Sequence, residues 1–226
     1  MDTTLFKDDV LDHGFVRLID HMGDDLSIVR NARVSYDAAW RSGENEGSDH
    51  RLLGYLMRNG HNTPFEAVTV TFEVKAPIFV FRQWHRHRTQ SYNELSARYK
   101  PLPEEYYVPD PLTIGVQSTD NKQMREMDGS SNDNASRIIA DSNFESYKNY
   151  QLLLKMGTPR EVARSVLPLG MYSHMFATAN LHNWLRFLSE RIHEHAQYEI
   201  QVYATAIKDL LCEIVPVTMD HWKENQ

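Results

Sequence analysis

One segment of the chain alternates apolar and polar residues without a break. Within residues 68–75, every second position is apolar, at Val68, Val70, Phe72 and Val74. Successive side chains of a strand point to opposite faces of a sheet, so this pattern predicts a strand with one buried face. Looser alternation over 15–19 and an apolar run over 171–179 predict two more strands.

Helix signals surround these strands. Asp24 and Asp25 favour a helix N-terminus, because they can cap free N–H groups and lie at the positive end of the helix dipole. We interpret Thr158-Pro159-Arg160-Glu161 as a capping box that opens a short helix. Other helices are expected at about 49–59, 77–88 and 135–156, and over 181–214 with a break near 193–195. Strands mixed with helices in no β-α-β order predict an α+β fold.

The length and the composition favour one catalytic domain over residues 1–226. At roughly 150 residues per domain, 226 residues make one large domain or two small ones. Residues 37–48 are polar and read as a loop, and 101–133 combine prolines with a polar tract. We therefore expect a variable, partly mobile excursion at about 110–140.

The same composition favours a cytoplasmic protein. The longest apolar run, residues 76–81, is far shorter than the roughly 20 residues of a membrane span. The N-terminus lacks the basic and apolar regions of a signal peptide. The single cysteine, Cys212, excludes an internal disulfide framework and suits a reducing compartment.

A cationic segment interrupts a chain whose net charge is −7. Residues 82–100 contain one acid, Glu94, and five cations, which are Arg82, Arg86, Arg88, Arg98 and Lys100. A solvated basic face would account for them. The apolar neighbours at 78–81 instead suggest partial burial, and buried arginines need partners. If 77–88 is helical, Arg82 and Arg86 share one face, and so do Gln83 and His87. Guanidinium groups suit phosphates and planar imides, so we expect an anion site here.

The segment also contains a motif: Arg86-His87-Arg88, seven residues, then Ser96. Further blocks accompany it at 61–66, 82–84, 91–96, 160–164 with Leu167-Pro168, and 196–201. With them the chain resembles the flavin-dependent thymidylate synthases from about Asp12 to Ala206, and residues 110–140 are unmatched.

This resemblance implies a methyltransferase of nucleotide biosynthesis. It would convert dUMP to dTMP with methylenetetrahydrofolate as carbon donor and NADPH as reductant, through bound FAD. The family fold implies a mixed or antiparallel sheet packed with helices. The family also forms homotetramers whose sites are shared between subunits.

The resemblance assigns the site residues as well. FAD would contact Thr63, Arg86, His87, Arg88, Glu94, Asn180, His182 and Arg186. The nucleotide would contact Arg82, Gln83, Arg86, Glu94, Leu95, Ser96, Ala97, Arg98, Arg164 and Arg191. Many relatives have Arg at position 182 and Asn or His at position 186. Arg186 could replace the cation that is missing at 182, or both could be ordinary surface substitutions.

Arg191 is the expected catalytic residue. Uracil C5 is a weak nucleophile until charge accumulates in the ring, and a guanidinium beside N3 and O4 favours the ionised imide. The alternative is a helix-surface arginine paired with Glu190 or Glu194. The other class of thymidylate synthase needs a reactive cysteine, whereas Cys212 follows Leu210-Leu211 and is interpreted as a core residue. Ser96 lacks an evident His–Asp relay, so we assign it to binding.

Two rival hypotheses follow from the same residues. His85 and His87, or His193 and His195, suggest a metal site, but i and i+2 side chains point to different helix faces. We therefore expect no metal. A non-catalytic RNA-binding protein could use the basic 82–100 segment, with stacking surfaces at Tyr92, Tyr99, Tyr106 and Tyr107. The negative net charge opposes that alternative, so no nucleic-acid partner is expected.

Overall fold

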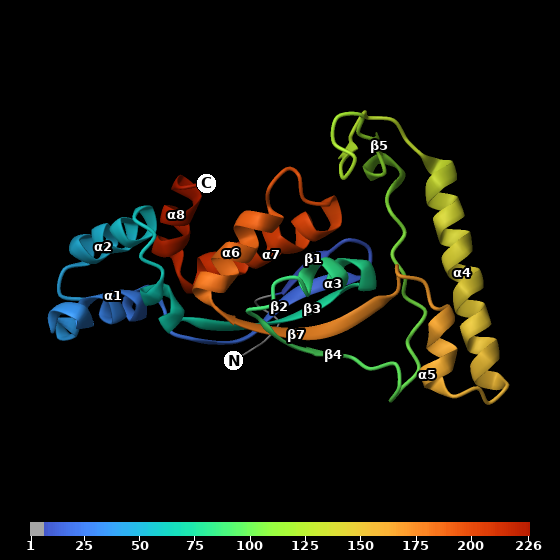
Figure 1. Ribbon diagram of the computed structural model, residues 1–226, viewed down its shortest axis with the longest axis horizontal. Helices are drawn as coiled ribbons and strands as arrows, with labels where there is room; N and C mark the ends of the chain where they lie inside the picture. Colours follow the sequence, from blue (N-terminus) through green and yellow to red (C-terminus); the bar gives the residue numbers. More distant parts are fainter. Residues whose placement is uncertain (1–6) are drawn as a thin grey trace.

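The computed structural model describes residues 7–226 and has an antiparallel five-stranded sheet at its centre (Figure 1). In spatial order the strands are β1 (Lys7–Val10), β2 (Gly14–Met22), β3 (Thr69–Pro77), β7 (Tyr172–Asn180) and β4 (Ser91–Glu94). The three predicted strands correspond to β2, β3 and β7, so these predictions are confirmed. The two edge strands, β1 and β4, were not predicted.

The alternation in β3 divides its side chains between a dry face and a wetter face. Val70, Phe72 and Val74 are fully buried. On the opposite face, Thr71 Oγ1 lies 2.8 Å from Thr178 Oγ1 of β7, and Glu73 pairs with Arg17 of β2 at 2.9 Å. Register and burial therefore follow directly from the period of two.

Two helices cover the apolar face of the sheet: α6 (Leu181–Arg191) and α7 (Tyr198–Ile214) (Figure 1). Trp184 of α6 packs edge-on against Phe72, and its indole N–H donates to the carbonyl oxygen of Val70 at 3.1 Å. Trp84, at the end of α3 (Ile78–Trp84), lies against Phe187 and Tyr203 in the same core. The break predicted near 193–195 separates α6 from α7 and is confirmed.

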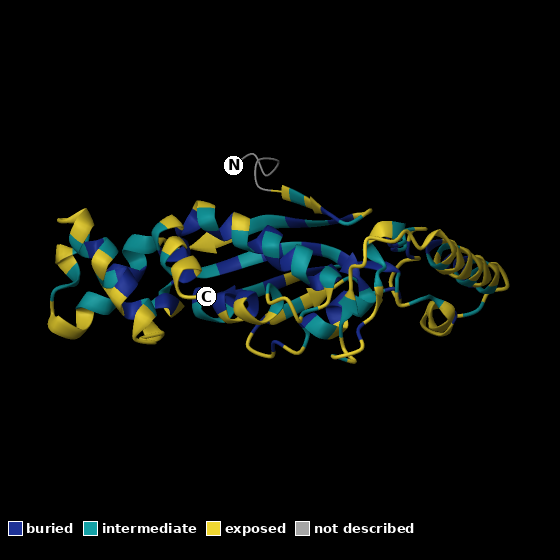
Figure 2. Cartoon of the chain, turned by 90° about the horizontal axis from the view of Figure 1, so that it is seen from above, coloured by how far each residue is buried: buried dark blue, intermediate teal, exposed yellow. Residues whose placement is uncertain are grey.

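The remaining helices lie at the two ends of the sheet (Figure 1). At one end are α1 (Asp25–Arg33), α2 (Glu46–Arg58) and α8 (Pro216–Glu224); at the other are α4 (Asp133–Lys155) and α5 (Arg160–Ala163). The α4 helix is largely exposed, whereas α1, α2 and α8 mix buried, half-buried and exposed residues, and the central strands are mostly buried or half-buried (Figure 2). Short 3-10 helices span Val34–Tyr36, Ala39–Arg41, Thr63–Ala67, Pro111–Thr113 and Arg164–Val166.

The expected excursion carries structure of its own. It contains a small hairpin, β5 (Val116–Gln117) and β6 (Arg125–Glu126), and then enters α4. The buried tyrosines Tyr147 and Tyr150 of α4 pack with Leu102 and Met171 in a second hydrophobic cluster. This cluster joins α4 to the segment that follows β4.

Several helix limits differ from the prediction. α1 has the expected Asp24 cap, but α2 begins at Glu46 rather than Asp49, within the predicted loop 37–48. The capping box at Thr158 is wrong: the backbone N–H of Thr158 bonds to the carbonyl of Leu153 and closes the C-terminus of α4, and Pro159 precedes α5. α8 was not predicted. Among the helices of residues 7–226, no helix is long and apolar enough to cross a membrane.

Candidate functional site

A tight turn, not a continued helix, carries the Arg86-His87-Arg88 motif. α3 ends at Trp84, so the predicted helix over 77–88 is wrong, and Arg82 and Arg86 do not share a helical face. The hydroxyl group of Tyr92 on β4 lies 2.7 Å from the carbonyl oxygen of His87 and 3.1 Å from that of Trp84. Burial raises the pKa of Tyr92 to about 12, so the hydroxyl keeps its proton and donates. This contact ties the turn to β4.

The turn places His87 against the end of α6. Its side chain is buried, and its Nε2 lies 2.9 Å from Nε of Arg191. Arginine can only donate, so Nε2 of His87 must accept and the imidazole is neutral, with its proton on Nδ1. Burial, reinforced by the Arg191 guanidinium, lowers the pKa of His87 to about 4, which agrees with this assignment.

Arg191 is therefore a fixed donor rather than a free surface cation. Its Nη2 also donates to the carbonyl oxygen of Gln83 at 3.3 Å. Three of its five N–H groups, both on Nη1 and one on Nη2, have no partner among residues 7–226 and could donate to a ligand. Within residues 7–226 it forms no ion pair with Glu190 or Glu194, so the alternative of a simple surface pair is not observed.

The other arginines near the motif are exposed, which corrects the expectation of partial burial. Arg82, Arg86 and Arg88 point to solvent, as does Arg164 after α5. Within the described chain, none of these four guanidinium groups pairs with an acid. An acidic protein thus holds a set of cations whose charge no carboxylate of the described residues offsets, as an anion site requires.

The segment after the turn is held by β7 and α5. Glu94 Oε1 accepts from Ser173 Oγ of β7 at 2.8 Å, and the Leu95 N–H donates to the carbonyl of His174. Ala97 is buried, whereas Leu95 and Ser96 are half-buried. Arg98 reaches Glu161 of α5 at 3.2 Å. Ser96 Oγ accepts from the Arg98 N–H at 3.3 Å, and no His–Asp relay is formed with it among the described residues.

The remaining FAD candidates lie along α6 or beyond its start. Asn180 caps α6 through its Oδ1, which accepts from the Asn183 N–H at 3.0 Å, a local role the sequence did not predict. His182 and Arg186 are four residues apart, so they lie on the same side of α6, and Arg186 pairs with Glu190 at 3.5 Å. Thr63 lines a shallow cavity of 610 Å³ with Arg30, Asn31 and Glu66.

The candidate residues thus form two groups. Gln83, His87 and Arg191 are in direct contact, and the segment 94–98 follows the same turn. Asn180 and Thr63 belong to the opposite end of α6, about 16 Å away along an 11-residue helix.

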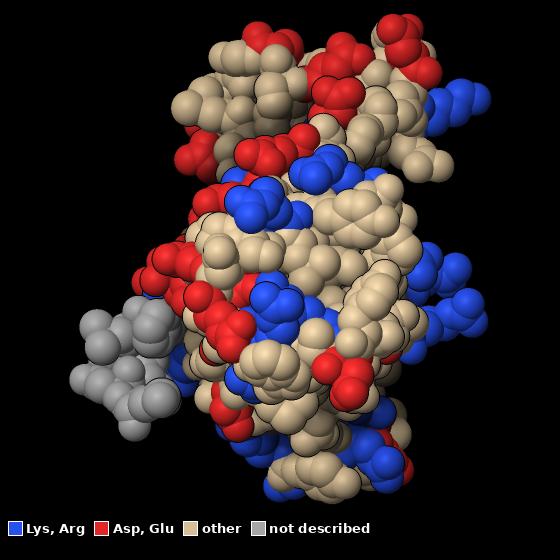
Figure 3. All heavy atoms as spheres, turned by 90° about the vertical axis from the view of Figure 1, so that its left-hand side faces the viewer, with Lys and Arg blue, Asp and Glu red and all other residues tan. Residues whose placement is uncertain are grey.

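Over the face of the molecule at the α1–α2 end, acidic and basic side chains are interspersed (Figure 3).

Sequence reasoning missed a polar cluster beside Gln83. Glu199 of α7 is almost completely buried and bonds to Arg125 of β6 and to Tyr107. Gln197 bridges Glu199 and Gln83. Gln197 and Glu199 lie in the block 196–201, one of those that resemble the family. Nothing in the sequence indicated that Glu199 pairs with Arg125, 74 residues before it.

The tyrosines of the RNA-binding hypothesis differ in exposure: Tyr99 is 83% exposed and Tyr106 is half-buried. Tyr107 is buried and Tyr92 is half-buried with its hydroxyl turned to the backbone, so neither offers an open stacking surface. Residues 7–226 contain no group of three or more His, Cys, Asp or Glu side chains arranged for a metal ion. Cys212 lies on α7, about 21 Å along the helix from Tyr198, and packs half-buried against the main hydrophobic core.

Comparison with known proteins identifies relatives over nearly the whole chain. Residues 17–217 match the family described as "Thymidylate synthase complementing protein". The flavin-dependent thymidylate synthase of Thermotoga neapolitana is 47% identical over 211 residues, which cover 93% of this chain and 91% of that protein. The enzyme of the same name from Thermus thermophilus is 44% identical, over 96% of this chain and 78% of its own length.

A solved structure with the same fold has a bound nucleotide. The UMP/dUMP methylase PolB from Streptomyces cacaoi, bound with 5-Br dUMP, superimposes with a TM-score of 0.86 at 35% identity. The match covers 96% of this chain and 97% of PolB. A second structure of PolB is bound with 5-Br UMP and has a TM-score of 0.85.

Proposed function

The chain belongs to the family of flavin-dependent thymidylate synthases, and we propose on this premise that it methylates dUMP to dTMP. Methylenetetrahydrofolate would donate the carbon and NADPH the reducing equivalents. The observation that carries the proposal is the contact between Arg191 and neutral His87, beside four arginines without acidic partners.

The residues present fit a flavin nucleotide. FAD carries a diphosphate, and the exposed Arg86 and Arg88, which have no acidic partner within residues 7–226, offer guanidinium groups of the kind that bind phosphate. Neutral His87 between them, and Thr63, Glu94, Asn180, His182 and Arg186, complete the proposed FAD contacts. Bound FAD would supply the electron transfer between NADPH and the nucleotide. His182 and Arg186 hold the adenosine end in this proposal, and the Arg186–Glu190 pair would have to open to free that guanidinium.

The nucleotide site follows from the same turn. Arg82, Arg98 and Arg164 would bind the phosphate of dUMP, because they are exposed cations around one segment. Gln83, Arg86, Glu94 and the backbone of 95–97 would orient the sugar and the base. Glu94 is pre-oriented by Ser173, which lowers the entropic cost of binding.

Arg191 would activate the uracil ring. His87 and the Gln83 carbonyl fix its guanidinium plane, and its free N–H groups would face the imide of the base. Burial lowers the pKa of Arg191, but arginine stays protonated in proteins, so it stabilises negative charge on the ring without accepting a proton. Charge drawn onto the ring makes C5 nucleophilic. The only cysteine, Cys212, is too far along α7 to attack C6 of a base held at this end.

We propose further that the described chain acts as one catalytic domain, in a cytoplasmic homotetramer that does not bind nucleic acid. The separation of Thr63 and Asn180 from Arg86–Arg88 supports shared sites, because residues from another copy could complete each group. Exposed aromatic residues near the Thr63 end, Tyr36 and Trp40, are 87% and 73% accessible and could lie between subunits.

The test is spectroscopic and then isotopic. The purified protein should show flavin absorbance, oxidise NADPH only when dUMP is present, and release tritium from [5-³H]dUMP. A colourless protein that does not take up added FAD, or NADPH oxidation that ignores dUMP, would refute the proposal.

A further inference from the structure

A continuous series of hydrogen bonds runs from the buried carboxylate of Glu199 to the side chain of Gln83. Glu199 Oε1 accepts from Arg125 Nη2 at 2.9 Å and from the Tyr107 hydroxyl at 3.1 Å. Glu199 Oε2 accepts from Gln197 Nε2 at 2.7 Å, and Gln197 Oε1 accepts from Gln83 Nε2. The series therefore connects the β5–β6 hairpin to the end of α3.

The chemistry of the carboxylate fixes the direction of every bond. A carboxylate accepts only, so the amide of Gln197 must turn its NH₂ group towards Glu199 and its oxygen away. That oxygen can only accept, so Gln83 must turn its own NH₂ group towards it. The side-chain oxygen of Gln83, Oε1, then has no partner among the described residues and remains free.

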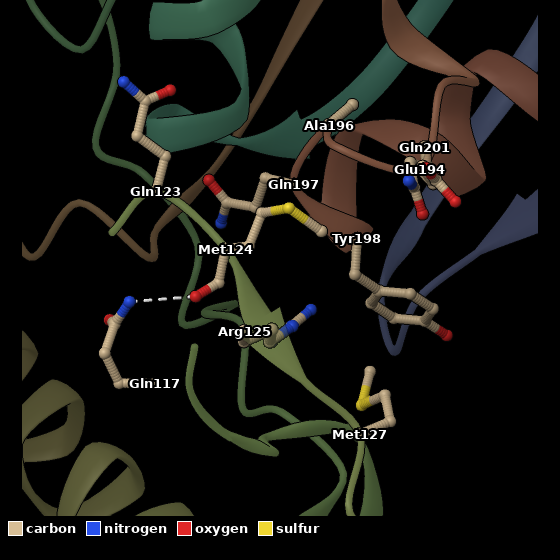
Figure 4. A pocket seen from close by; sticks show the side chains of 10 residues that line it. All are labelled: Gln117, Gln123, Met124, Arg125, Met127, Glu194, Ala196, Gln197, Tyr198 and Gln201. Atoms are coloured by element: carbon tan, nitrogen blue, oxygen red, sulfur yellow. Dashed lines mark hydrogen bonds between the residues drawn. The ribbon is translucent and has the colours of Figure 1, made fainter. Parts of the chain in front are cut away.

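The far end of the series is rigid. The Glu199 side chain is only 3% exposed, and the Arg125 guanidinium lies over the Tyr198 ring, 5.1 Å from its centroid. Burial and the Glu199 carboxylate raise the pKa of Tyr107, so its hydroxyl remains a donor. Arg125 and Gln197 line one cavity of 530 Å³ between the hairpin and α7 (Figure 4).

We propose that Arg125, Glu199 and Gln197 are positioning residues that fix the polarity of the Gln83 amide towards the nucleotide. The inference rests on the proposed function, in which Gln83 contacts dUMP. Gln83 then presents an oxygen acceptor to a donor group of the nucleotide. The β5–β6 hairpin, part of the segment that the family motifs do not cover, thereby acts on the site without touching the substrate.

Glu199→Gln tests the direction of the series with little change of shape. A glutamine at 199 can donate as well as accept, so the Gln83 amide can turn over. We expect KM for dUMP to rise about tenfold, with kcat and flavin content within about twofold of the parent. Gln197→Leu should give a similar rise, because it breaks the series while Glu199 keeps its charge and its bonds to Arg125 and Tyr107. Arg125→Ala should raise KM for dUMP, and Arg125→Lys should raise it less. The matched control is Arg137→Ala, which removes an exposed arginine of α4.

The decisive measurement is a double-mutant cycle. In a Gln83→Ala background, Glu199→Gln and Gln197→Leu should change KM for dUMP by less than about twofold, because the group they act through is gone. The inference is overturned if their effects are undiminished in that background, if KM is unchanged in the single variants, or if flavin is lost in proportion. A parent protein that does not convert dUMP refutes the proposed function itself, and the inference with it.

Discussion

Replacing His87 with glutamine removes a titrating group from the contact with Arg191 but keeps an acceptor there. In the parent, burial and Arg191 lower the pKa of His87 from its ordinary 6.5 to about 4. The unfolded chain therefore binds the proton more tightly than the folded chain. His87 lowers the stability as the pH falls from 6.5 towards 4, and has no such effect above 6.5.

The size of the effect follows from the two pKa values. Between about pH 7.5 and about pH 5, complete expression of this shift would cost about 2 kcal/mol of unfolding free energy. Solvent reaches part of the surroundings of the ring, so we expect about half, ~1 kcal/mol. The Arg191 contact should weaken over the same range, because a protonated His87 cannot accept its N–H.

The measurement is urea unfolding of the parent and of His87→Gln at the two pH values. His21→Gln, at an exposed position of β2, is the matched control. Between the two pH values, the parent should lose ~1 kcal/mol more unfolding free energy than His87→Gln, because the contributions of all other groups cancel in the difference. The parent and His21→Gln should lose equal amounts. Equal losses in the parent and in His87→Gln would show that His87 is not held neutral, and the assignment of its Nε2 as an acceptor would be wrong.

Three further predictions concern the site and its support. Arg191→Ala should lower kcat/KM for dUMP by about 100-fold or more while flavin content stays within about twofold, since the proposed FAD contacts do not include Arg191; equal activity would remove Arg191 from the mechanism. Tyr92→Phe removes the hydroxyl that donates to the Trp84 and His87 carbonyls, which keep only their backbone donors, and should cost about 1 kcal/mol in urea unfolding. An unchanged unfolding midpoint would contradict the account of the turn. Asp24→Ala should cost about 1 kcal/mol through loss of the α1 cap, whereas Asp24→Asn should retain most of it.

The features predicted correctly from sequence are those with local causes. The period of two in β3 and the Asp24 cap of α1 each act within a few residues, and both are confirmed. Thr158 misled because the same residue can begin one helix or close another. The N–H groups of Gly157 and Thr158 bond to the last carbonyls of α4, those of Leu154 and Leu153. Gly157 has the positive φ of 79° that such a closure needs.

The features missed depend on distant partners. Where α3 ends at Trp84, the Tyr92 hydroxyl donates to the carbonyls of Trp84 and His87 and Gln90 accepts from the Trp84 indole, and no helix-breaking residue marks that point. Short polar β4 is a strand only because β7 lies beside it. The motif did identify the residues around the turn. Their exposure, and the pairing of Arg125 with Glu199, required the folded chain.

α6 acts as a spacer of set length between the Asn180 end and the Arg191 end. One residue inserted in it would rotate Arg191 by about 100° around the axis, away from His87, and leave Asn180 where it is. Residues 110–132, which precede α4, contribute no strand to the central sheet, so they can gain or lose length without such a rotation, provided that the Arg125 contact is kept. Length variation among relatives should therefore concentrate in that segment and spare α6.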